Sequence, residues 1–160
     1  MNTHKGFTLV EVMLVMVIAG VLLTTTAQSL FQSQQSISLD AMTARFVVEV
    51  REQQMRAISG DTAPLGSYID YSVRLEADRY ILFPGSVYDE GNPINTVVTL
   101  EAPLVFANST LPSSTMTFTR GRGEISAFSQ GQNSFDIQNP QTGSEKAITV
   151  NQRGVLWVAE

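Results

Sequence analysis

An uncharged, mostly apolar run near the N-terminus constrains this chain more than any other feature of its sequence. The run starts at Phe7, directly after Gly6, and its most apolar part ends at Leu23, with Glu11 as the one charged residue inside it. Mildly polar residues extend the run, and a helix over 7–31 would be about 38 Å long. Because the hydrocarbon core of a bilayer is about 30 Å thick, the sequence predicts a membrane-spanning helix at 7–31.

The residues beside this segment predict its orientation. His4 and Lys5 precede the apolar run and the next basic residue is Arg45, so the positive-inside rule places the N-terminus in the cytoplasm and the rest of the chain outside. A cleaved secretory signal has a shorter apolar core followed by an A-x-A-like site. This run is longer and has no clear site of that kind. A plain membrane anchor is therefore the simplest interpretation.

A plain anchor does not explain Glu11. An ionisable side chain at the centre of a spanning helix costs about 2.5–3.5 kcal/mol, and less near the end of the helix, where Glu11 lies. Such charges usually pair with another group. Lys5 precedes Glu11 at a spacing that does not place the two on one helical face. We therefore expect the partner of Glu11 on another chain.

The stretch KGFTLVEVMLVMVIAGVLL closely resembles the N-terminal signal of type IV prepilins and type II secretion pseudoprepilins. That signal is a short basic leader ending in Gly, then Phe, then Glu within a long apolar helix. The resemblance implies that a membrane aspartyl peptidase removes the leader, residues 1–6, by cutting between Gly6 and Phe7, and then methylates the new N-terminus at Phe7. It also implies that Glu11 faces the Phe7 ammonium of a neighbouring subunit in a filament. Because a lone buried charge is unfavourable, this pair would fix the stagger of adjacent helices.

A second periodic segment, 32–60, predicts that the same helix continues as an amphipathic half. Its apolar residues recur at helical spacing: Leu39, Met42, Phe46 and Val50, with Val47, Met55 and Ile58 widening the stripe. Glu52 and Arg56 have the spacing of a favourable ion pair. Ser59 and Gly60 provide a credible stop. We expect one helix from about Thr8 to Ser59, with its second half laid against a globular head.

The remaining residues, 61–160, predict a small β-rich head. Apolar and polar residues alternate around Tyr71 and Val73, which is the period of a half-buried strand. Further short strands, separated by turn-rich pieces, are predicted at 80–83, 96–100, 104–107, 116–119, 124–128, 134–137, 146–151 and 155–158. Short strands after one long hydrophobic-to-amphipathic helix predict an α+β fold with two small antiparallel sheets.

The C-terminal part of the sequence resembles one group of subunits within this family more than others. The pieces MTFTRGRGEIS and KAITVNQRGVLWV are similar to the C-terminal hairpin and closing strands of minor pilins and of the H-type pseudopilin of type II secretion. Many major type IV pilins carry a C-terminal cysteine pair and a proline within the stem. This chain has no cysteine and no proline before Pro64. The resemblance therefore implies a minor subunit of a type IV pilus or of a secretion pseudopilus.

The same resemblance implies a location and a set of partners. The subunit would cross the bacterial inner membrane once, with its head in the periplasm, and would then enter a filament. Its partners would be other pilin or pseudopilin subunits, the prepilin peptidase and methyltransferase, the inner-membrane assembly platform and, before assembly, membrane lipid. One rival hypothesis is a DNA-uptake or adhesion pilin whose head binds a ligand directly. Another is an anchored domain that joins no filament.

Two surface features of the predicted head have a functional and a simpler interpretation. Arg120, Arg122 and Arg153 lie near glycine turns, and some related minor pilins bind DNA through such residues, since Arg readily contacts phosphate. The net charge of −5 favours the simpler interpretation, in which the three arginines solvate turns. The turn 88–92, YDEGN, offers oxygen ligands for Ca²⁺, but its spacing is not that of an EF-hand, so an acidic surface turn is favoured.

Trp157 alternates with its neighbours in the last strand and is predicted to lie in the core.

The composition limits the catalytic groups that the head could contain. The chain has no cysteine and its only histidine is His4, so the head contains no Cys nucleophile, no His general base and no His/Cys metal cluster. An enzyme built from carboxylates, Lys or Ser would remain. We expect a structural protein that is not an enzyme and that uses no cofactor or metal.

Overall fold

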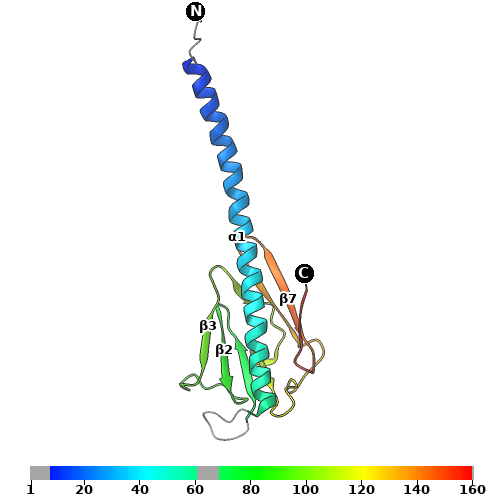
Figure 1. Cartoon of the computed structure of the whole chain (residues 1–160). Helices are drawn as coiled ribbons and strands as arrows, with labels where there is room; N and C mark the ends of the chain where they lie inside the picture. The colour runs from blue at the N-terminus through cyan, green and yellow to red at the C-terminus, as the bar shows by residue number, and fades with distance from the viewer. Residues whose placement is uncertain (1–7, 61–68, 160) are drawn as a thin grey trace, which may run out of the picture. The chain divides into compact units, whose positions relative to one another are not determined.

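The fold comes from a computed structural model (Figure 1). The structure describes residues 8–60 and 69–159, and within the long helix it describes the side chains of residues 8–23 and 38–60. The chain divides into two compact units, Met1–Ser36 and Ile37–Glu160, and each unit is described by itself.

One helix, α1 (Leu9–Ser59), occupies the range that the sequence predicted. Thr8 precedes its first turn and accepts a hydrogen bond on Oγ1 from the backbone N of Glu11 over 3.3 Å. At the other end Gly60 has a φ of 67°, a left-handed conformation that glycine adopts without steric cost at the end of a helix. The start and the stop of α1 are therefore both explained by residues within one turn of its ends.

The second half of α1 buries a row of side chains. The members predicted from their spacing are indeed buried: Leu39, Met42, Phe46 and Val50. Met55 and Ile58, which were predicted to widen this stripe, are 55% and 41% exposed, so that prediction is wrong. The buried row continues instead through Gln53 and Ala57. Gln53 and Ala57 follow Val50 at helical spacing, whereas Met55 lies on another face of the helix.

The rest of the described chain forms two four-stranded antiparallel sheets, which confirms the α+β prediction. Sheet A has the order β3-β2-β1-β5 and sheet B the order β4-β6-β7-β8. The strands are β1 (Tyr71–Leu75), β2 (Arg79–Pro84), β3 (Thr96–Thr99), β4 (Val105–Ala107), β5 (Thr115–Phe118), β6 (Ser134–Asn139), β7 (Ser144–Val150) and β8 (Leu156–Ala159), and a short 3-10 helix, η1, covers Pro112–Ser114. In Figure 1 the second half of α1, in cyan, runs between β2 and β3 on one side and β7 on the other.

One aromatic side chain joins α1 to both sheets. The ring of Phe46 lies 5.0 Å from that of Tyr80 in β2, 5.4 Å from Phe106 in β4 and 5.6 Å from Phe135 in β6, measured between centroids. Aromatic pairs in such edge-to-face arrangements add about 0.5–1.5 kcal/mol each beyond area burial. The two sheets and the second half of α1 therefore share one hydrophobic core.

The strand predicted at 124–128 is wrong. The described residues of this segment form no strand, and an isolated bridge pairs Ile125 with Phe118. Ala127 has a φ of 54°, which an extended strand does not permit. Ile125 nevertheless packs against the core, and this contact accounts for an apolar residue in a loop.

Trp157 does not lie in the core, contrary to the prediction. Its side chain is 54% exposed on β8, an edge strand of sheet B. Its neighbour Leu156 packs against the core instead. Because side chains alternate between the two faces of a strand, the tertiary structure buries one of these neighbours and exposes the other.

Candidate functional site

Glu11 lies in the first turn of α1 with its side chain exposed. Its backbone N donates to Thr8 at two atoms, the carbonyl O at 3.1 Å and Oγ1 at 3.3 Å. The sequence T-x-x-E is the pattern of a capping box, and a carboxylate in the first turn interacts favourably with the helix dipole. The two hydrogen bonds involve only the backbone of Glu11, so the local contribution of its side chain is a negative charge in the first turn of α1. The prediction of its role from sequence missed this, although the T-x-x-E signal was present.

The first turns of α1 expose apolar side chains on every side. From Leu9 to Leu23 all described side chains are exposed, and the exposed fractions of the large apolar ones range from 45% at Val12 to 76% at Leu9. A helix that is apolar all round is typical of a segment that becomes buried among other apolar groups. An exposed apolar surface of this extent indicates an interaction surface.

The predicted processing site, Gly6 and Phe7, lies outside the described residues, as does the predicted leader at 1–6. Among the residues that the structure describes, no helix combines the length and the apolarity needed to pass through a bilayer.

The structure brings together the two glycine turns that carry the predicted arginines. Gln54 of α1 donates from Nε2 to the carbonyl O of Gly123 at 2.9 Å and to the carbonyl O of Arg153 at 2.6 Å. One side chain of the helix therefore holds both turns. Nothing in the sequence pattern singled out Gln54 for this role.

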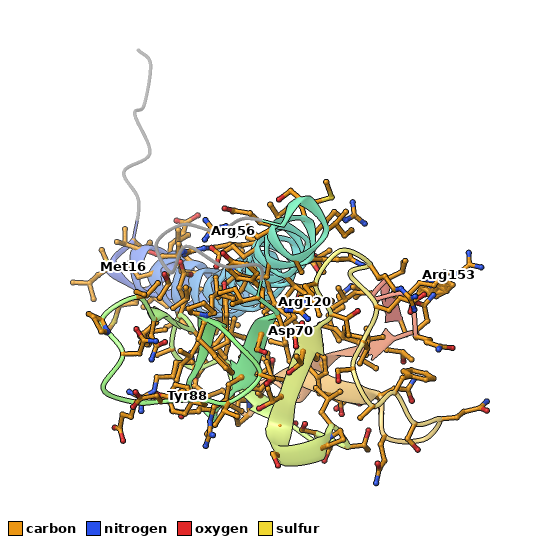
Figure 2. All side chains as sticks on the ribbon, turned by 90° about the horizontal axis from the view of Figure 1, so that it is seen from below. Met16, Arg56, Asp70, Tyr88, Arg120 and Arg153 are labelled. Carbon is orange, nitrogen blue, oxygen red and sulfur yellow. The ribbon has the colours of Figure 1, made fainter. Side chains whose placement is uncertain are left out.

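The arginine side chains themselves do not converge. All three, Arg120, Arg122 and Arg153, are exposed. In Figure 2 Arg153 points outward at the edge of the head, whereas Arg120 lies beside Asp70. The backbone N of Arg120 donates to Asp70 Oδ1 at 2.9 Å. This arrangement fits the solvation of turns better than a shared surface for a phosphate backbone.

The acidic turn at 88–92 uses its oxygens within the loop. Asp89 Oδ1 accepts a hydrogen bond from the backbone N of Gly91 at 3.0 Å, and the carbonyl O of Asp89 accepts one from Asn95 Nδ2 at 2.7 Å. In the described ranges, 8–60 and 69–159, no three side chains of His, Cys, Asp or Glu gather as they would around a metal ion. The segment is a hydrogen-bonded surface turn.

Comparison with known proteins agrees with the N-terminal pattern. Residues 1–27 match the family model of the prokaryotic N-terminal methylation motif. This match supports a type IV pilin-like or pseudopilin role, in a class of proteins that is structural rather than enzymatic. No curated protein and no solved structure matches the chain. The closer resemblance to an H-type minor pseudopilin therefore stays a prediction.

Proposed function

We propose that this chain is a minor subunit of a type IV pilus or of a type II secretion pseudopilus, cut after Gly6, methylated at Phe7 and held in the filament by α1. The observation that carries the proposal is the match of residues 1–27 to the methylation motif. The apolar surface exposed around the first turns of α1 supports it, because helices of this kind are stable when bundled with others.

Glu11 has a second role in this proposal. Cleavage at Gly6 creates an ammonium group at Phe7, and in a low-dielectric bundle its natural counter-ion is a carboxylate. Within the described part of the chain the Glu11 carboxylate forms no ion pair. The Phe7 ammonium of a neighbouring subunit would pair with it and set the stagger between adjacent helices.

The subunit reaches the filament from the membrane. It crosses the inner membrane once at 7–31, with its N-terminus in the cytoplasm and its head in the periplasm, and the inner-membrane assembly platform transfers it to other pilin or pseudopilin subunits. The lack of cysteine and the pairing of β7 with β8 across a turn at Gly154 support a minor subunit of the H type. The function is assembly, and the chain is not an enzyme.

The experiment that tests the proposal is N-terminal sequencing and mass spectrometry of the membrane form. The mature chain should start at N-methyl-Phe7. A chain that starts at an intact Met1 in cells with an active prepilin peptidase would overturn the proposal and leave a simple anchored domain. A Gly6→Val variant is the matched control, since it alters only the residue before the cut and should keep the full-length chain.

A further inference from the structure

We propose that the head also binds a ligand with a carboxylate on an apolar body, in a pocket on the face of sheet A that is turned away from α1, with Arg74 as the anchor. The pocket has a volume of about 460 Å³, within the roughly 300–1,000 Å³ of small-molecule sites. In Figure 2 Tyr88, which lines it, lies on the opposite side of the head from Arg56 of α1. Binding there requires neither cleavage nor assembly, so it is independent of the filament function.

The alternation of β1 places Arg74 on this outer face. Val73 and Leu75 belong to the hydrophobic core that includes α1. Because successive side chains of a strand point to opposite faces, Ser72 and Arg74 point away from that core. Ser72 Oγ donates to the carbonyl O of Gly85 at 2.6 Å and so ties the start of the loop after β2 to the same face.

The wall of the pocket carries one charge. Among the described residues that line it, Arg74 is the only charged side chain. Phe83, Ile125 and Phe128 supply apolar surface, while Ser126 and Gln132 supply neutral polar groups. A concave, mostly apolar site with one charged anchor is the usual composition of a small-molecule site.

The guanidinium of Arg74 is held in place but is not hydrogen-bonded within the described chain. Its Cζ lies 4.8 Å from the centroid of the Tyr88 ring. Its buried Nε has no hydrogen-bond partner among the described residues, although Glu76 Oε1 lies 3.5 Å away as an ion pair. Glu76 also accepts from Arg79 Nε at 2.7 Å on its other oxygen. Two guanidinium groups thus share one carboxylate. On the side of the pocket, Arg74 is the charge that an anion would meet.

Two residues of the pocket wall have a backbone conformation that residues with a Cβ rarely adopt. Ser113 has a φ of 51° and Ala127 a φ of 54°, and both line the pocket. For alanine this left-handed conformation is unfavourable, and its side chain has no polar group that could offset the cost. Backbone strain of this kind clusters at ligand sites. This observation supports a binding role independently of the charge of Arg74.

These features together select the ligand class. A carboxylate can accept two parallel hydrogen bonds from a guanidinium, which is planar and already positioned here by Tyr88. The apolar body of the ligand would contact Ile125 and Phe128. A cation would be repelled by Arg74, and a neutral ligand would gain no charge-to-charge hydrogen bond from the guanidinium. The carboxylate belongs either to a free small acid or to the C-terminus of a peptide chain.

The test uses the full chain, kept in solution by a zwitterionic detergent, and two probes of the same shape. Phenylacetate carries the carboxylate, and phenylacetamide is its neutral match. Nuclear magnetic resonance titration should show saturable shifts at Tyr88, Ser126 and Gln132 with phenylacetate, and binding of the amide should be about tenfold weaker or more. Two short peptides ending in Phe, one with a free C-terminal carboxylate and one amidated, form the second arm. Tighter binding of the free-acid peptide assigns the site to a chain end, and tighter binding of phenylacetate assigns it to a small acid.

The anchor is tested by substitution. Arg74→Gln should abolish the preference for the acid over the amide, whereas Arg51→Gln, an exposed arginine of α1, should keep it. Circular dichroism checks that both variants fold. Equal binding of acid and amide by the unaltered chain, no saturable shift at the pocket up to the solubility of the probes, or an unchanged preference in Arg74→Gln would each overturn the proposal. The comparison of acid and amide on the unaltered chain decides the matter even if Arg74→Gln fails to fold.

Discussion

Tyr80 of β2 donates its phenolic hydrogen to Oε2 of Glu49 on α1 over 2.7 Å. The other oxygen of this carboxylate accepts from Arg45 Nε at 2.8 Å. Tyr80 is fully buried, and burial, followed by the hydrogen bond to Glu49, raises the pKa of its phenol above the ordinary value of 10.0. This hydrogen bond therefore links the helix to sheet A through a group whose ionisation depends on folding.

The raised pKa of Tyr80 predicts a loss of stability in alkaline solution. The unfolded chain releases the phenolic proton at a lower pH than the folded chain, so the free energy of unfolding should fall as pH rises past about 10. The expected slope from this group is about 1.4 kcal/mol per pH unit until the folded-state pKa is reached. Tyr80→Phe should lack that slope and should cost about 1 kcal/mol near neutral pH. Urea unfolding monitored by circular dichroism over a pH series measures the free energy of unfolding of the unaltered chain and of Tyr80→Phe. If the two free energies changed in parallel above pH 10, this assignment would be contradicted.

Substitutions at two valines of α1 distinguish the effect of burial on stability from the effect of helix propensity. Val50 is 0% exposed and Val48 is 66% exposed. Val50→Ala should lower the free energy of unfolding by about 1.5–3 kcal/mol, because it removes buried apolar surface and leaves a cavity. Val48→Ala should change it by less than about 0.5 kcal/mol. Equal effects in chemical unfolding would mean that this half of α1 is not packed as described.

Substitutions at two glycines with nearly equal φ distinguish the stability cost of steric contact from the cost of backbone strain. Gly154 and Gly143 have φ of 76° and 73°. A Cβ at Gly154 would lie 2.5 Å from Gln54 Nε2 and 2.8 Å from the carbonyl O of Gly123, whereas a Cβ at Gly143 would meet no atom within 4 Å. Gly143→Ala should therefore cost about 1–2 kcal/mol from the backbone alone, and Gly154→Ala should cost at least about 1 kcal/mol more. Similar losses in thermal unfolding would show that the two glycine turns are not tightly joined by Gln54.

Substitutions of Glu11 separate the effect of a polar side chain in the first turn of α1 from the proposed charge pair. Glu11→Val removes the polar group and the charge, while Glu11→Gln keeps a side chain of the type found in a capping box and removes the charge. Both variants should be inserted and processed to Phe7 yet should enter filaments poorly, because the ammonium of the neighbour would stay unpaired. Immunoblots of sheared filaments against membrane fractions measure this. If Glu11→Gln assembled like the unaltered chain, the local role of Glu11 would suffice and the charge pair would be dispensable.

The N-terminal signal was readable from sequence because its parts are contiguous. Gly6, Phe7 and Glu11 lie within a few residues of one another, and their spacing carries the information. The pocket on the outer face of sheet A was not readable in this way. Arg74, Ser113 and Ser126 come from separate segments, and no local pattern states that β1, η1 and the loop after β5 meet there.

The sequence by itself determined the elements whose causes are local. Thr8 and Gly60 lie at the two ends of α1. The helical period of its second half predicted the buried Phe46, and alternation predicted most strands of both sheets. These features depend on residues within one turn or one strand. Only the tertiary structure decided that Trp157 is exposed and Leu156 is packed, because burial depends on which distant segment covers each face. The same long-range packing brings the Arg74 guanidinium, an aromatic ring and strained loop residues to one pocket.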